Sequence, residues 1–175
     1  MKKNSRRCVF IFLSILCGTY FFLEVLENPG RGEQYAMRFD GATYLGKEGV
    51  VIQTDRNNCG PCSLKMIFDH FKIPSLLTDI ESDIGYVGRK VTFQMIQASA
   101  QRKGIKSEAW KVSFRDLATK PFPSLLLVRN SHYVVADSIV NDDIYMRDPA
   151  LGRISMHKNN LSTIWKGESL LFWKE

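Results

Sequence analysis

Cys59 is the residue of this sequence best placed to do covalent chemistry. A polar run, Thr54 to Asn58, leads into it, and Pro61 suits the first turn of a helix. That helix is predicted because apolar residues recur at helical spacing from Leu64 to Phe71. Free backbone N–H groups and the positive end of the helix dipole favour a thiolate at such a position. The sequence therefore predicts a nucleophilic cysteine, which needs a base as its partner.

The chain has three histidines that are candidates for this base. His70 falls on the polar edge of the predicted helix, and His157 follows a strand with no acid placed to orient it. His132 opens an apolar strand, where the strand would hold the imidazole rigidly at the mouth of a cleft. We therefore predict that His132 is the general base and acid for Cys59.

Two further residues would complete a hydrolytic site. Asp148 ends the neighbouring strand and begins a turn at Pro149, so across a hairpin it can hold the second ring nitrogen of His132. Gln53 lies six residues before Cys59 and can donate a hydrogen bond to an oxyanion, beside the backbone N–H of Cys59. The predicted site is Cys59, His132, Asp148 and Gln53.

These side chains need an α+β scaffold in which helices come first and an antiparallel sheet follows. Helices are predicted from Cys59 to Phe71, around Ser75 to Ile84, and from an N-cap at Thr92 to a stop at Gly104. Residues 113–116 resemble a short capped turn, and a short helix is predicted near residues 161–165. Strands are predicted at residues 50–53, 106–112, 124–129, 131–140, 143–147, 154–156 and 169–173.

The N-terminal region predicts a membrane segment ahead of this domain. Residues 1–7 are basic and form a cytoplasmic n-region, and residues 8–26 are an apolar stretch of roughly 28 Å, enough to span a bilayer. This is the pattern of a signal peptide or of an uncleaved signal anchor, and we favour the anchor. Residues 27–47 read as a linker and residues 48–175 as the catalytic domain. The charge bias predicts a single-pass protein of the inner (cytoplasmic) membrane, with the N-terminus inside and the domain on the periplasmic or extracellular side.

Composition narrows the class of protein. The net charge is +6, but Lys2, Lys3, Arg6 and Arg7 supply most of that excess, so the domain gives no case for nucleic-acid binding. The four cysteines are too few and too clustered for a disulfide scaffold, and no Cys/His set has zinc spacing. No glycine-rich phosphate loop is present, so we predict neither a metal nor another cofactor.

Four blocks of the sequence, taken in order, resemble the bacteriocin-processing cysteine peptidases. The blocks are Gln53 with Asn58-Cys59-Gly60, Ser131-His132-Tyr133-Val134-Val135, Arg147-Asp148-Pro149-Ala150-Leu151-Gly152, and Trp165-Lys166-Gly167. Those enzymes are papain-like domains, usually fused to ABC exporters, that cut leader peptides after a double glycine. The resemblance implies a papain-like fold for residues 49–172 and peptide-bond hydrolysis through a thioester. It also implies a double-glycine leader peptide as the substrate.

The sequence departs from that family in three ways. It contains no nucleotide-binding domain and no six-helix transporter, so we expect a free-standing enzyme that works with separate export machinery. The predicted topology places the domain outside the cytoplasmic membrane, whereas exporter-fused domains work inside. Cys62 occupies a position where the family more often has a small residue.

Two other functions remain open at this point. Cys59-Gly60-Pro61-Cys62 is also the tetrapeptide of thioredoxins, so an exported thiol-disulfide oxidoreductase is one alternative. Asn58 in place of a tryptophan and the charged loop before Cys59 argue against it. A non-cleaving peptide-binding module of the same fold is the other alternative. In an oxidising compartment, Cys59 and Cys62 would also be able to form a reversible disulfide that silences the nucleophile.

Overall fold

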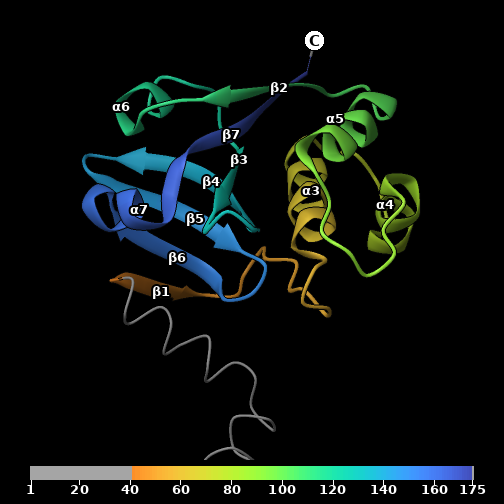
Figure 1. Ribbon diagram of the computed structural model, residues 1–175, viewed down its shortest axis with the longest axis horizontal. Helices are drawn as coiled ribbons and strands as arrows, with labels where there is room; N and C mark the ends of the chain where they lie inside the picture. The colour runs from red at the N-terminus through yellow and green to blue at the C-terminus, as the bar shows by residue number, and fades with distance from the viewer. Residues whose placement is uncertain (1–40, 175) are drawn as a thin grey trace, which may run out of the picture. The chain divides into compact units, whose positions relative to one another are not determined.

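The computed structural model describes residues 41–174 (Figure 1). The predicted n-region, the membrane segment and most of the predicted linker lie outside the described residues, so these assignments stay predictions. Within residues 41–174, none of the helices is both long and apolar enough to cross a membrane.

A short edge strand opens the described chain, three helices follow it, and two shorter helices lie among the remaining strands. The helices are α3 (Cys59–His70), α4 (Leu77–Ile84), α5 (Phe93–Arg102), α6 (Phe114–Leu117) and α7 (Lys158–Ile164). The strands are β1 (Ala42–Gly46), β2 (Lys106–Lys111), β3 (Ser124–Val128), β4 (His132–Val140), β5 (Asp143–Asp148), β6 (Gly152–His157) and β7 (Trp165–Trp173). This order confirms the predicted α+β class.

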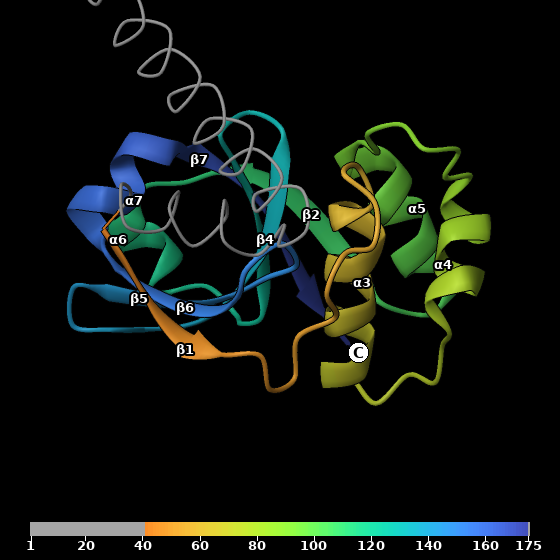
Figure 2. The same ribbon diagram turned by 90° about the horizontal axis from the view of Figure 1, so that it is seen from below.

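Helix α3 lies between the sheet and the pair formed by α4 and α5 (Figures 1 and 2). It begins at Cys59, where Cys62 N–H donates the first helical hydrogen bond to the carbonyl of Asn58. Its apolar residues are fully buried because neighbours cover it on both sides. The predicted N-cap at Thr92 is also present, since its hydroxyl accepts a hydrogen bond from Met95 N–H at the start of α5.

The seven strands of the described region form one antiparallel sheet in the order β1-β6-β5-β4-β3-β7-β2. Hairpins join β3 to β4 and β4 to β5, so the start of β4 and the end of β5 meet at one end of the sheet. Side chains alternate between its two faces: Leu125 and Val135 pack with the helices, while Leu126 and Val134 pack with α6 and α7. The central strands are therefore buried on both faces, as the continuous apolar run in β3 predicts.

Two short segments differ from the prediction. Residues 42–46, assigned to the linker because of their glycine-rich surroundings, form the edge strand β1, which pairs with β6. Gly41 and Gly46 have positive φ values of 66° and 109°, so these glycines turn the backbone at the ends of a strand rather than marking loose chain. Residues 50–53, predicted as a strand, have no ladder partner and run as irregular chain toward α3.

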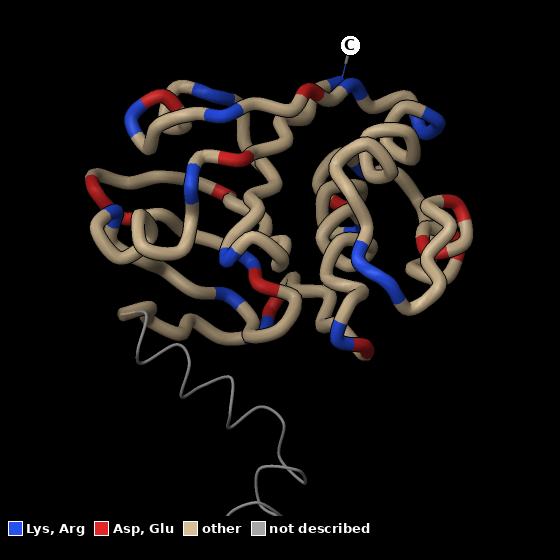
Figure 3. The backbone as a smooth tube through the Cα atoms, in the orientation of Figure 1, with Lys and Arg blue, Asp and Glu red and all other residues tan. Residues whose placement is uncertain are grey.

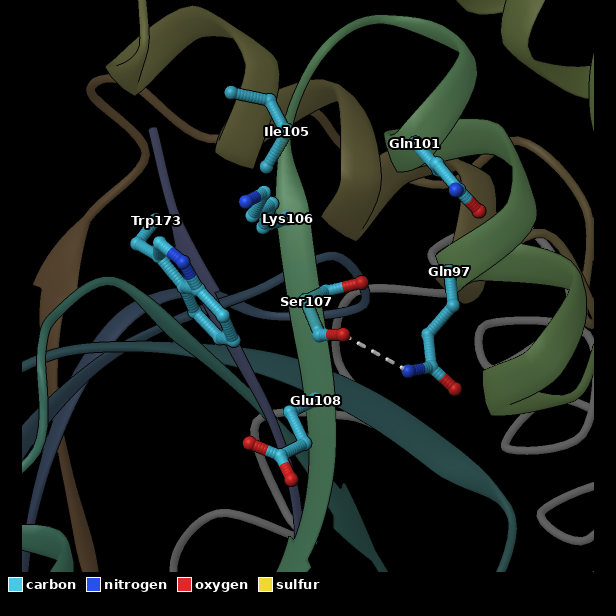
Figure 4. Close-up of a pocket in the computed structure, with 7 residues that line it drawn as sticks. All are labelled: Gln97, Gln101, Ile105, Lys106, Ser107, Glu108 and Trp173. Carbon is cyan, nitrogen blue, oxygen red and sulfur yellow. Dashed lines mark hydrogen bonds between the residues drawn. The ribbon is translucent and has the colours of Figure 1, made fainter. Parts of the chain in front are cut away.

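A pocket of about 420 Å³ lies between α5 and the edge strand β2 (Figure 4). Gln97 reaches across it from α5, and its Nε2 donates a hydrogen bond of 3.1 Å to the carbonyl of Ser107. Helix α5 thus satisfies a backbone carbonyl that the edge strand β2 would otherwise expose to solvent. None of the predicted site residues lines this pocket.

Candidate active site

Cys59 is the first residue of α3 and is 4% exposed. One turn along the helix, the Ser63 hydroxyl donates a buried hydrogen bond of 3.3 Å to the carbonyl of Tyr133 in β4. Tyr133 follows His132 directly, so this bond ties the start of the helix to the strand that carries the imidazole. Packing of α3 against β4 therefore brings the cysteine and the histidine together.

His132 is placed by the tight connection between β3 and β4. Arg129 and Asn130 both adopt positive φ values, 51° and 58°, and His132 pairs directly with Val128 across the hairpin. Turn residues with positive φ match the twist of the flanking strands, which fixes the register of the first residue after the turn. The imidazole thus stands at the end of a central strand, as predicted.

Asp148, the last residue of β5, holds the imidazole. One of its carboxylate oxygens, Oδ1, lies 2.7 Å from His132 Nε2 and also accepts a hydrogen bond of 2.7 Å from Ala150 N–H. The carboxylate is buried, and the turn that begins at Asp148 supplies the second bond. Because Nε2 is occupied by Asp148, Nδ1 is the ring nitrogen left for Cys59.

Cys59 and His132 shift each other's pKa in opposite directions. For Cys59, the largest single influence on the pKa is burial, which raises it. The hydrogen bond and charge of His132, together with the backbone N–H groups of Tyr133 and Gly60, outweigh burial and bring the pKa below its ordinary value of 9.0. For His132, burial lowers the pKa, but the hydrogen bonds and charges of Asp148 and Cys59 raise it well above 6.5. The pair therefore favours thiolate and imidazolium over two neutral groups.

Gln53 lies beside the turn that carries Asp148, since its N–H donates a hydrogen bond of 2.9 Å to the carbonyl of Pro149. Its side-chain oxygen Oε1 is buried and has no hydrogen-bond partner among the described residues. A buried polar atom without a partner is uncommon and marks a place where a ligand can complete the hydrogen bonding.

The other candidate residues lie outside this arrangement. His70 is the exposed last residue of α3, at the opposite end of the helix from Cys59. His157 caps α7, where its Nδ1 accepts a hydrogen bond from Asn159 N–H. Cys62 is fully buried, and burial, with the charges of Glu81 and Cys59, raises its pKa to about 12. Cys62 is therefore protonated at neutral pH, and Cys59 is the one of the two that supplies a thiolate.

Sequence reasoning missed two backbone groups of the site. The N–H groups of Gly60 and Tyr133 both hydrogen-bond to the Cys59 sulfur and lower its pKa. The only clue to them in the sequence is position, because Gly60 directly follows Cys59 and Tyr133 directly follows His132. Within residues 41–174, no group of three or more His, Cys, Asp or Glu side chains is arranged to hold a metal ion.

Comparison with known proteins agrees with this geometry. Residues 47–175 match the peptidase C39 family, which is most of the chain. The chain belongs to the peptidase C39 family. It is therefore a cysteine peptidase, a hydrolase.

Two relatives and one solved structure are similar to this C39 peptidase. An uncharacterized protein of Methanothermobacter marburgensis is 25% identical over 137 residues, covering 78% of this chain and 96% of its own length. The probable microcin-H47 secretion/processing ATP-binding protein of Escherichia coli is 27% identical over 124 residues, covering 71% of this chain but only 18% of that protein. The crystal structure of a double glycine motif protease from an AMS/PCAT transporter, in complex with the leader peptide, superposes with a TM-score of 0.69. It is 20% identical and covers 77% of this chain and 98% of that one, which confirms the predicted papain-like fold.

Proposed function

We propose that this C39 peptidase hydrolyses a peptide bond through a thioester on Cys59, with His132 as base and acid and Asp148 as its orienter. The observation that carries the proposal is the chain of hydrogen bonds from Cys59 through His132 to Asp148, which includes the 2.7 Å contact between Nε2 and Oδ1. A nucleophile, a base and an orienting group in this order are the parts that acyl transfer requires.

The reaction follows from the protonation states of this pair. The Cys59 thiolate attacks the scissile carbonyl carbon, and the negative charge moves to the carbonyl oxygen. The tetrahedral intermediate collapses as the imidazolium gives its Nδ1 proton to the leaving amine, which breaks the C–N bond and leaves a thioester. His132 then takes a proton from water as the water attacks the thioester, and Cys59 departs as the thiolate.

The oxyanion needs hydrogen-bond donors at the position where its charge develops. We assign this role to the backbone N–H of Cys59 and the side-chain amide of Gln53. The backbone N–H of Gln53 donates to the carbonyl of Pro149, one residue beyond Asp148, which supports an oxyanion donor close to the turn that carries the orienter. A side-chain donor in a comparable oxyanion hole contributes about 10²-fold to 10³-fold in kcat.

We propose a leader peptide with a Gly-Gly site as the substrate. Support comes from proteins similar to this chain, which include a double glycine motif protease in complex with the leader peptide and a probable microcin-H47 secretion/processing protein. We further propose that residues 8–26 anchor the chain in the cytoplasmic membrane, with residues 48–175 on the periplasmic or extracellular side. In that position the enzyme would act on a peptide delivered by separate export machinery.

The test is cleavage by the full-length chain in detergent. The chain and a Cys59→Ala variant are incubated under reducing conditions with a peptide containing a Gly-Gly site, and products are identified by mass. Cleavage after the second glycine by the unsubstituted chain alone is the expected result. Equal cleavage by Cys59→Ala would count against the mechanism. No cleavage of any Gly-Gly peptide by either protein would count against the substrate.

A further inference from the structure

The side chain of Asn58 does not cap helix α3, although asparagine at this position usually caps the helix that follows it. An N-cap asparagine ordinarily accepts a hydrogen bond from the N–H of the second or third helical residue. Asn58 is the N-cap of α3 and is 1% exposed, yet no N–H of the helix donates to its side chain. Instead, Oδ1 accepts from Asp55 N–H at 3.2 Å, and Nδ2 donates to Thr54 Oγ1 at 3.3 Å and to Glu81 Oε1 at 3.1 Å.

This diversion leaves two backbone N–H groups available at the helix start. Pro61, the third helical residue, has no N–H, and Cys62 N–H bonds to the carbonyl of Asn58. The N–H groups of Cys59 and Gly60 donate to no main-chain oxygen within the described part of the chain. Gly60 N–H points to the Cys59 sulfur, and Cys59 N–H is the backbone donor that we assign to the oxyanion. A conventional cap by Asn58 would take the N–H of Gly60, the only capping donor that remains.

Glu81 is the group that holds Asn58 in the diverted position from outside the loop. It lies on α4, which packs against α3, and Figure 3 shows the acidic positions of α4 in red. A hydrogen bond to an ionised carboxylate is roughly twice as strong as one between neutral groups, so Glu81 competes well for the Asn58 amide. Thr54 and Asp55 contribute only neutral partners, a hydroxyl and a backbone N–H, from within the loop.

We propose that Glu81 is a positioning residue of this peptidase. By holding the Asn58 amide toward α4, it keeps the N–H groups of Cys59 and Gly60 free for the oxyanion and the thiolate. Glu81 touches no reacting atom and acts through Asn58. The inference rests on the proposed function, because it assigns those two N–H groups to the chemistry of Cys59.

The experiment compares three variants of the full-length chain in detergent. Glu81→Ala removes the acceptor, Glu81→Gln keeps an oxygen acceptor, and Asp79→Ala removes an exposed carboxylate from the same helix as a matched control. The rate of Cys59 alkylation by iodoacetamide is followed against pH by peptide mass, and kcat and KM are measured on a Gly-Gly peptide. The titratable groups that act on Cys59, or that its charge acts on, are His132 and Tyr133 on β4, Cys62 on α3 and Tyr86 after α4. The charge of Glu81 raises the pKa of Cys62 and of Tyr86, and Glu81→Ala and Glu81→Gln both remove it, so a difference between these two variants reports the hydrogen bond to Asn58.

The expected result separates positioning from a purely structural role. Glu81→Ala should move the alkylation profile to higher pH and lower kcat by about tenfold with little change in KM, since one donor to the reacting atoms is diverted. Glu81→Gln should stay close to the unsubstituted chain, and Asp79→Ala should match it. An unmoved alkylation profile in Glu81→Ala, or an equal shift in Asp79→Ala, would overturn the inference.

A pair of compensating substitutions keeps the test decisive if Glu81→Ala does not fold. Asn58→Asp alone sets a carboxylate against Glu81 and removes the donor of their hydrogen bond. Adding Glu81→Gln restores a bond with its direction reversed, because the introduced amide can donate to the introduced carboxylate. The double variant should recover alkylation and kcat relative to Asn58→Asp, and a double variant no faster than Asn58→Asp would refute the role of Glu81.

The two proposals fail in different ways. If Gly-Gly peptides are not cleaved but the alkylation profile still depends on Glu81, the substrate is wrong and the positioning role stands. If Cys59→Ala still cleaves, the proposed function fails whatever the alkylation of Cys59 shows.

Discussion

At the residue scale, the site depends on how charge is shared between Cys59 and His132. Burial alone would favour a neutral thiol beside a neutral imidazole, since both groups lose solvent. The opposite result comes from hydrogen bonds to the charged forms, above all the bond between His132 and Asp148. The side chain of His132 is 22% exposed, so solvent reaches the imidazole of the pair.

Replacing Asp148 with asparagine should narrow the pH range of activity. Without the carboxylate, the pKa of His132 falls, so the imidazolium is lost at lower pH and the alkaline limb moves down. The pKa of Cys59 rises because it faces less positive charge, so the acid limb moves up. We expect kcat/KM at its optimum to fall on the order of 10²-fold. The measurement is kcat/KM against pH for the two proteins.

The control for this profile is Asp137→Asn. Asp137 also ends in a carboxylate on the β4–β5 hairpin, but it pairs with Arg147 at 2.7 Å and does not contact His132. Its profile should keep both limbs of the unsubstituted enzyme. Unchanged limbs in Asp148→Asn would show that Asp148 does not set the pKa of His132.

Cys62 should be dispensable for peptidase activity. Its thiol is buried, its pKa is raised to about 12, and no step of the proposed reaction uses it. Cys62→Ala should keep kcat within about twofold and lower the free energy of unfolding by about 1 kcal/mol, as expected for a small buried side chain. Reduction of insulin disulfides that depends on Cys62 would instead revive the oxidoreductase alternative.

At the element scale, the start of α3 must approach the segment before α5 without a side chain at position 60. A Cβ on Gly60 would lie 2.2 Å from Cγ2 of the buried Val91, and the Tyr133 hydroxyl holds that segment by donating to the carbonyl of Val91 at 3.0 Å. Alanine has the better helix propensity by roughly 1 kcal/mol, but a contact this short outweighs that gain.

Gly60→Ala should therefore destabilise the protein by about 1–3 kcal/mol and lower activity. The informative comparison is a double-mutant cycle with Val91→Ala, which removes the clashing methyl group. The double variant should be less destabilised than the sum of the two single variants, as measured by urea unfolding. Additive losses would mean that Val91 is not what excludes a side chain at position 60.

Sequence patterns predicted the elements whose cause is local and missed those whose cause is tertiary. Helix α3, the Thr92 cap and the continuously apolar β3 follow from periodicity and capping chemistry, and the order Cys59, His132, Asp148 followed from chemistry together with strand ends. Strand β1 could not be predicted because its pairing partner, β6, lies more than a hundred residues away and its side chains are largely exposed. The diverted side chain of Asn58 depends on Glu81, and nothing in the helical pattern of α4 distinguishes that glutamate from its acidic neighbours.

At the scale of the whole described domain, one sheet joins two hydrophobic clusters. The cluster on one face contains the buried residues of α3, α4 and α5, and the cluster on the other face contains those of β5, β6 and α7. Strands β3, β4 and β7 contribute side chains to both. Cys59 comes from the helical side and Asp148 from the strand side, so the site is intact only when both clusters are formed.

Unfolding of the domain should consequently be a single cooperative transition. The three tryptophans, Trp110, Trp165 and Trp173, all lie in β2 and β7, so their fluorescence reports the sheet. Labelling of Cys62 by a thiol reagent, followed by peptide mass, reports the helical layer because this side chain is fully buried in α3. In urea, fluorescence, Cys62 labelling and peptidase activity should share one midpoint.

Leu64→Ala in the first cluster and Ile154→Ala in the second should each shift all three midpoints together, with a loss of about 2–5 kcal/mol in the free energy of unfolding. A variant that exposes Cys62 and loses activity while its tryptophan transition stays in place would show that the helical layer unfolds independently of the sheet.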